Sequence, residues 1–79
     1  MIAINDLIVG YIYKVKARNF QKAVYIGDGC FKGVREKFGA RYIDREFYKT
    51  DCGGTVKPFF NCNQQAELTD EKIFEALDK

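Results

Sequence analysis

Apolar and polar side chains alternate between residues 7 and 18, which is the spacing of a strand with one buried and one solvated face. The predicted buried face carries Val9, Tyr11, Tyr13, Val15 and Ala17, and the opposite face carries Lys14, Lys16 and Arg18. A shorter strand is predicted over residues 23–26, which are mostly β-branched or aromatic. Asp28-Gly29 follows and favours the positive φ angles of a tight hairpin turn leading into Cys30 and Phe31.

Residues 31–38 fit two different structures. As a strand, the segment places Phe31 and Val34 on opposite faces, and a bulge with an extra residue at Gly33 would bring them into phase. As a helix, Phe31, Val34 and Phe38 have the spacing i, i+3, i+7, and Gly39 could end the helix in the left-handed conformation. We favour the strand, and the helix remains an alternative.

The pattern continues with two further strands. Residues 42–49 are rich in aromatic residues and predict a strand with one wet face. Asp51-Cys52-Gly53-Gly54 predicts a turn, because paired glycines supply backbone freedom. Residues 55–60 resume the β character, and Pro58 confines this strand to an edge or to its own end.

A polar connection over residues 61–67 leads to the C-terminal helix. Thr69 is a good N-cap residue, and the following Asp70 and Glu71 complement the helix dipole. Leu68 can contact Ile73 as a hydrophobic staple. The helix is predicted over about residues 69–78, with an apolar side made of Ile73, Phe74 and Leu77.

These elements predict a mostly β (α+β) fold in one domain. About five short strands joined by glycine turns fit a small, strongly bent antiparallel sheet or an SH3-like barrel, with one C-terminal helix. The single domain is expected to span residues 1–79, with a β body over about residues 7–60, because 79 residues leave room for one core.

Charge and cysteine content narrow the class of protein. The first 63 residues carry eleven Lys or Arg against six Asp or Glu, and the remainder carries two against five, so a basic body bears an acidic tail. No apolar run reaches the length of a membrane span, and the three cysteines are too few and odd in number for a secreted disulfide scaffold. We therefore expect a cytoplasmic protein with no membrane association.

The composition argues against catalysis. The chain has no His and no Ser, which removes the common general base and the common hydroxyl nucleophile. Cys30, Cys52 and Cys62 include no CxxC pair, so structural or incidental thiols are a better explanation than a zinc site or a catalytic cysteine. We expect no enzymatic activity, no metal and no cofactor.

Cations and aromatic rings follow one another along the predicted strands, and they supply the candidate binding residues. Cations at alternate strand positions project from one face and could contact phosphates, while exposed rings could stack on bases or fill protein pockets. A solvated outer face over an aromatic core explains the same pattern without any ligand. The candidate residues are Lys14, Lys16, Arg18, Lys32, Arg35, Lys37, Arg41, Tyr42, Arg45 and Phe47.

Several segments between residues 10 and 58 resemble small uncharacterised proteins of phages and their bacterial hosts. The resemblance rests on residues 11–20, Gly27-Asp28-Gly29, residues 35–39 and residues 54–58, and it includes no catalytic motif. It implies an accessory protein that acts stoichiometrically, by blocking a host complex or sequestering a ligand.

Two function hypotheses follow. The first is a non-enzymatic binding protein, a phage-encoded inhibitor of a bacterial defence complex, acting on a host protein through one basic and aromatic face. The alternative is a small nucleic-acid-binding or nucleotide-sequestering domain in which arginines grip phosphates and Tyr42 or Phe47 stacks on bases. A homodimer formed by pairing of exposed edge strands is also compatible with the sequence.

Overall fold

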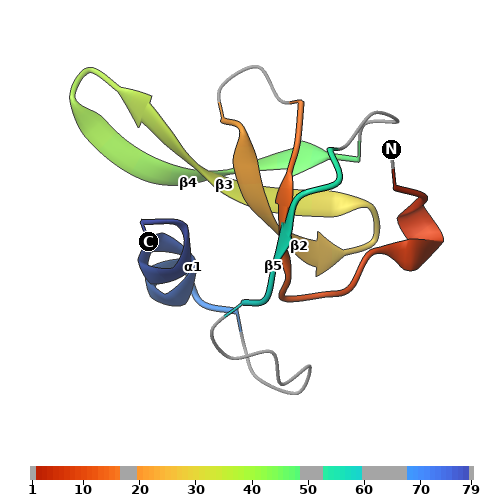
Figure 1. The fold of residues 1–79 in the computed structure, drawn as a ribbon. Coiled ribbons are helices and arrows are strands. Elements are labelled where there is room, and N and C mark those ends of the chain that lie inside the picture. The colour runs from red at the N-terminus through yellow and green to blue at the C-terminus, as the bar shows by residue number, and fades with distance from the viewer. Residues whose placement is uncertain (1, 17–19, 49–52, 60–67, 79) are drawn as a thin grey trace.

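The computed structural model describes residues 2–16, 20–48, 53–59 and 68–78, which form one antiparallel sheet and one helix (Figure 1). The elements are the 3-10 turn η1 (Ile4–Asp6), strands β1 (Ile12–Lys14), β2 (Lys22–Gly27), β3 (Cys30–Lys37), β4 (Ala40–Phe47) and β5 (Val56–Lys57), and helix α1 (Asp70–Leu77). The strand order is β4-β3-β2-β1-β5. The mostly β fold with five strands and a C-terminal helix is thus confirmed, and the sheet is open, with β4 and β5 as edges of its described part.

Strand β1 is much shorter than the predicted strand over residues 7–18. Gly10 adopts a φ of +90°, a conformation that interrupts an extended chain, and the Gly10 N–H donates to the Tyr25 carbonyl over 2.8 Å. The residues before it form η1 and a turn instead of pairing with β2. Ala17 and Arg18 lie outside the described residues.

Residues 31–38, which fitted either a strand or a helix, form a strand as far as Lys37, because β3 extends over Cys30–Lys37. Asp28 and Gly29 both adopt positive φ angles between β2 and β3, which confirms the predicted Asp-Gly turn. The β3–β4 register is continuous, so the predicted bulge at Gly33 is wrong; the register shift lies on β2, between Tyr25 and Gly27. Glycine is required at position 33 for a different reason. The Phe20 ring lies against it, and a Cβ there would lie 2.7 Å from ring atoms of Phe20.

Other parts of the chain cover both faces of the sheet, and the face that carries Tyr13 and Tyr25 is called the tyrosine face. Its buried cluster consists of Tyr13, Val15, Phe20, Ala23, Tyr25 and Phe31. The Ile8 N–H donates to the Tyr13 hydroxyl over 2.8 Å, and the Tyr48 hydroxyl donates to the Ile2 carbonyl. The N-terminal segment therefore closes this face, and the tyrosine hydroxyls bond to its backbone.

The opposite face, named the helix face, is covered by α1, which packs against β2 and β3 (Figure 1). Its buried cluster consists of Ile12, Val24, Phe59, Ile73, Ala76 and Leu77. Thr69 caps the helix by accepting a hydrogen bond from the Lys72 N–H over 3.4 Å, as predicted. The predicted apolar side is right for Ile73 and Leu77, whereas Phe74 is only half-buried and Ala76 takes its place in the core.

The remaining predictions concern the C-terminal part of the sheet. Strand β5 has only two residues and lies at the sheet edge directly before Pro58, as expected from the missing N–H of proline. Asp51, Cys52 and the connection over residues 61–67 lie outside the described residues. Within the described ranges, no helix combines the length and apolar character needed to cross a membrane.

Candidate functional site

The predicted binding residues do not form a single face. Directly opposed residues of neighbouring strands share a face, so the register assigns each side chain to one side of the sheet. Arg35, Lys37 and Tyr42 belong to the tyrosine face, whereas Lys14, Lys32, Arg41, Arg45 and Phe47 belong to the helix face. The expectation of one continuous basic and aromatic surface is therefore wrong, because β3 and β4 carry cations on both sides.

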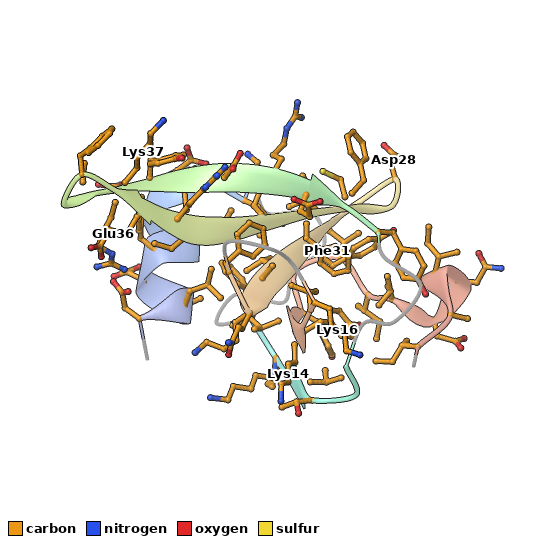
Figure 2. All side chains as sticks on the ribbon, turned by 90° about the horizontal axis from the view of Figure 1, so that it is seen from above. Lys14, Lys16, Asp28, Phe31, Glu36 and Lys37 are labelled. Carbon is orange, nitrogen blue, oxygen red and sulfur yellow. The ribbon has the colours of Figure 1, made fainter. Side chains whose placement is uncertain are left out.

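Distance along the sheet divides the candidates further. Figure 2 shows Lys37 at the free end of the β3–β4 hairpin, far from Lys14 and Lys16 near β1. Arg18 lies outside the described residues.

Two of the predicted cations hold the helix on the sheet. Lys32 Nζ lies 3.5 Å from Asp70 Oδ1 in the first turn of α1, and Arg41 donates to Asp78 Oδ1 at the end of the same helix. The Arg41 guanidinium also lies over the Phe74 ring, 5.6 Å from its centroid. These contacts fix both ends of α1 against β3 and β4, so Lys32 and Arg41 already have partners within the protein.

Arg35 forms an ion pair on the tyrosine face. Its Nη1 lies 2.7 Å from Asp44 Oδ2, across the β3–β4 ladder. The hydrogen bond from Arg35, together with one from the Arg45 N–H, holds the pKa of the Asp44 carboxyl below its usual value. The same contact with Asp44 raises the pKa of Arg35, so both groups remain charged at neutral pH.

The tip of the β3–β4 hairpin presents a feature that the sequence pattern did not identify. Phe38 and Gly39 form a two-residue turn in which both residues have positive φ angles, 53° and 79°. The Phe38 side chain is 96% exposed, the most exposed large apolar side chain in the described residues. Lys37 Nζ lies 5.6 Å from the centroid of its ring. A hydrophobic ring beside a cation therefore forms the end of the hairpin.

Two other exposed rings are separated from this tip. Phe47, at the other end of β4, is 71% exposed and lies opposite Cys30 on the helix face. Tyr42 is 36% exposed and lies opposite Arg35 on the tyrosine face. The seven steps of β4 between Ala40 and Phe47 span roughly 23 Å, so Phe38 and Phe47 cannot belong to one small patch.

Phe38 was missed because the sequence pattern suggested a buried position. In the helical alternative it shared the apolar side with Phe31 and Val34, whereas each of the three has a different environment in the structure. The available signal was the spacing of two β segments around Phe38-Gly39. A residue-Gly pair between two strands is the signature of a two-residue hairpin, which places the first residue at the tip.

The chemistry of the described residues includes no metal-binding group of three or more His, Cys, Asp or Glu side chains. Cys30 is a free thiol, buried at the start of β3. Cys52 and Cys62 lie outside the described residues.

These features define a small open β-sheet protein with one helix on one face and a projecting hairpin. Comparison of the chain with protein-family models, with curated proteins and with solved structures finds no match in any of the three.

Proposed function

We propose that the protein is a non-enzymatic binding protein of the cytoplasm that inserts the tip of its β3–β4 hairpin into an apolar pocket on a protein partner. The observation that carries this proposal is Phe38, which is exposed and adopts a left-handed backbone conformation. That conformation costs a bulky residue about 1–2 kcal/mol relative to the right-handed region. An exposed ring recovers none of this cost through burial in its own fold.

A partner pocket would account for both features of Phe38. Aromatic anchors that fill a pocket supply much of the binding energy in protein interfaces. Backbone strain in proteins occurs frequently at ligand-binding positions, where it holds a group in a required orientation. Phe38 combines the two properties at the most protruding position of the hairpin.

The hairpin is built to present this ring rigidly. Eight consecutive residue pairs join β3 to β4, from Cys30 opposite Phe47 to Lys37 opposite Ala40. The turn contains only two residues, so little freedom remains at the tip. An anchor that is already ordered loses less entropy on binding. Lys37 beside the ring further favours a pocket with an acidic rim.

The observed ion pairs favour a protein partner over nucleic acid for the predicted arginines. Arg35 and Arg41 lie on opposite faces, and each is bonded to a carboxylate, Asp44 and Asp78 respectively. Tyr42 shares its face with Arg35, and Phe47 shares its face with Arg45. No single surface of the described residues therefore combines several available arginines with a stacking ring.

The resemblance of residues 10–58 to small phage proteins directs the choice of partner. We propose a bacterial defence complex as the first partner to examine, with the protein acting as its stoichiometric inhibitor. The resemblance is the reason to look for the partner among bacterial proteins, and exposed Phe38 is the reason to expect contact through the hairpin tip.

Capture from lysate tests the proposal directly. A tagged protein is incubated with nuclease-treated bacterial lysate, and the retained protein is identified and purified. Its affinity is then measured by calorimetry for the wild-type protein, Phe38→Ala and Phe47→Ala. We expect Phe38→Ala to weaken binding by about 30-fold or more, as loss of a hot-spot ring does. Phe47→Ala is the matched control, because it removes an exposed ring from the far end of β4.

Three outcomes would contradict the proposal. Equal affinities of wild type and Phe38→Ala would show that the tip is not the anchor. A parallel capture from untreated lysate that retains only nucleic acid, which nuclease then removes, would identify a nucleic acid instead of a protein as the partner. An eluate without any stoichiometric protein, from lysates that contain defence complexes, would remove the inhibitor hypothesis.

A further inference from the structure

Three lysines from three neighbouring strands line one recess on the helix face, beyond the area that α1 covers. Lys14 of β1 lies directly opposite Lys22 of β2, and Lys57 of β5 lies directly opposite Ile12 of β1. The recess has a volume of about 280 Å³ and is lined by Ile12, Lys14, Gln21, Lys22, Thr55 and Lys57. Lys14 was predicted as a binding residue, but Lys22 and Lys57 were not.

The arrangement is unfavourable for the isolated protein. Like charges directly opposite each other on antiparallel strands repel, as Lys14 and Lys22 must. Among the residues that the structure describes, no carboxylate lies within ion-pair distance of Lys14, Lys22 or Lys57. Lys32 and Arg41 on the same face differ in this respect, since Lys32 pairs with Asp70 of α1 and Arg41 pairs with Asp78, which directly follows the helix.

The chain around Lys14 holds it in place at this recess. The Gly53 N–H donates to the Lys14 carbonyl over 2.6 Å, and the Lys14 N–H donates to the Thr55 carbonyl over 3.2 Å. A Cβ at Gly53 would lie 3.2 Å from Lys14 Cβ and 3.3 Å from its Cγ, so the glycine lets the backbone lie against the lysine stem. The Lys14 backbone and the base of its side chain are therefore held in place, and its charge has no partner among the residues that the structure describes.

The lining is suited to an anion with several oxygen atoms. Three ammonium groups, the Thr55 hydroxyl and the Gln21 amide can all donate hydrogen bonds, and buried Ile12 supplies an apolar floor. A phosphate group accepts several such bonds through its oxygens, and hydrogen bonds between charged partners are the strong ones. A carboxylate has fewer acceptor atoms and less charge to balance three cations.

A second recess adjoins the first and indicates the size of the ligand. It has a volume of about 350 Å³ and shares Gln21 and Lys22 with the recess that the three lysines line. Its lining also includes the apolar side chains of Phe20, Val34 and Leu77. Small-molecule sites commonly combine an apolar wall with a few convergent polar groups. The pair of recesses therefore suits a phosphate group attached to an organic group of about nucleoside size.

We propose that the recess of Lys14, Lys22 and Lys57 binds the phosphate of a small organic phosphate such as a nucleoside monophosphate. A nucleic acid strand is less suitable, because it requires a track of available cations along successive phosphates. The neighbouring Lys32 and Arg41 are engaged by Asp70 and Asp78 and do not extend such a track. This site is separate from the hairpin tip at Phe38 and does not depend on it.

Titration of the ¹⁵N-labelled protein followed by NMR tests this assignment, with adenosine monophosphate, inorganic phosphate and adenosine as probes. We expect adenosine monophosphate and phosphate to shift the same amides, those of residues 12–14, 21–22 and 55–57, and adenosine to leave them unchanged. Lys22→Gln should raise the dissociation constant for adenosine monophosphate about tenfold or more. Lys72→Gln is the matched control, since Lys72 lies on α1 outside both recesses.

Thermal unfolding separates loss of the site from loss of the fold. Without ligand, Lys22→Gln should melt at the same temperature as wild type or higher, because the substitution removes repulsion with Lys14. With adenosine monophosphate, wild type and Lys72→Gln should gain more stability than Lys22→Gln. Phe38→Ala should bind adenosine monophosphate like wild type, which keeps this test independent of the hairpin.

Several results would overturn the assignment. One is an absence of saturable shifts at millimolar adenosine monophosphate and phosphate. Another is an equal loss of affinity in Lys22→Gln and Lys72→Gln, which would indicate attraction to overall charge. Binding of a single-stranded oligonucleotide without binding of adenosine monophosphate would identify a nucleic acid surface instead.

Discussion

The two halves of strand β3 differ sharply in what surrounds them. In the first half, Cys30, Phe31 and Gly33 are buried, and the Phe31 ring lies 5.2 Å from the Tyr25 ring and 6.2 Å from the Tyr13 ring between centroids. In the second half, burial fades, and every residue from Glu36 to Arg41 is exposed around the turn. Strand β4, which pairs along the whole of β3, contains no buried residue.

This difference separates the part of the chain that folds the protein from the part that is free to contact other molecules. The body of the sheet is held by two packed clusters, one on each face. The hairpin end is held by the backbone ladder and by cross-strand pairs such as Arg35 with Asp44, each worth only about 0.2–1 kcal/mol. Apart from Arg41, which bonds to Asp78, the side chains at that end therefore contribute little to stability, and they can be suited to a binding partner without loss of the fold.

The largest expected effect comes from removing one buried ring, on β3, and one exposed ring, on β4. Phe31→Ala should lower the free energy of unfolding by about 3–5 kcal/mol, because it leaves a cavity among packed rings. Phe47→Ala should change it by no more than about 0.5 kcal/mol, since that ring is largely exposed. Urea denaturation measures both values. Similar losses in the two variants would mean that β4 belongs to the core.

A smaller effect is expected from adding one methyl group to the packed half. Gly33→Ala should destabilise the protein by about 1–3 kcal/mol, because the new Cβ would overlap the Phe20 ring. Gly54→Ala is the control: its Cβ would meet no atom within 4 Å, and its free energy of unfolding should equal or exceed that of wild type. If Gly33→Ala unfolds like Gly54→Ala in urea, Phe20 does not restrict position 33.

The exposed half should respond in the opposite direction. Phe38→Asn should stabilise the protein by about 1 kcal/mol, because asparagine tolerates the left-handed conformation that phenylalanine adopts at a cost. If the proposed protein partner binds this tip, the same variant should lose affinity for it, so gain of stability and loss of binding would occur together. Thermal unfolding checks the first effect. A loss of stability would indicate that the ring contributes to the fold, for example through Lys37.

The order and type of most elements could be predicted from local pattern. Asp28-Gly29 determines a hairpin by backbone preference alone, Thr69 determines the start of α1, and Pro58 ends β5, so each acts without knowledge of the rest of the chain. The alternation around Tyr13 and Val15 likewise identified core residues. The sequence was therefore sufficient to predict an element wherever the conformational preference of one or two residues decides where that element begins, turns or ends.

The errors arose where tertiary contacts decide. The alternating pattern predicted that one face of the strand over residues 7–18 is exposed to solvent, so Ile12 was not placed in the core. In the structure α1 covers that face as well. Gly33 was interpreted as a bulge, although its role is to admit the Phe20 ring from a distant segment. No local pattern contains the position of that ring.

The candidate site was predictable in residue type but not in arrangement. Cations at alternate positions of one strand do lie on the same face of the sheet. The antiparallel register then decides which side chains of the neighbouring strand lie on that face. Arg35 and Arg41 were therefore grouped although the sheet separates them. Lys22 and Lys57 were omitted although β1 brings both beside Lys14.

The smallest effect expected is a dependence on pH that arises in the exposed half of the hairpin. The pKa of Asp44 is lowered by its hydrogen bond with Arg35, so this pair stabilises the fold above the usual carboxyl pKa. The contribution is lost as the pH falls through the lower pKa of the folded state. Asp44→Asn should therefore be less stable than wild type near neutral pH, and the two should converge in acid.

Urea denaturation of wild type and Asp44→Asn at about pH 7, 4 and 2 measures this difference. The difference should be modest and should shrink with added salt, because both side chains are 35% exposed and solvent screens the pair. Glu36→Gln is the control, since that carboxylate lies on the helix face, opposite Arg41, and is exposed. A difference that is constant with pH would mean that the charge of Asp44 does not stabilise the hairpin.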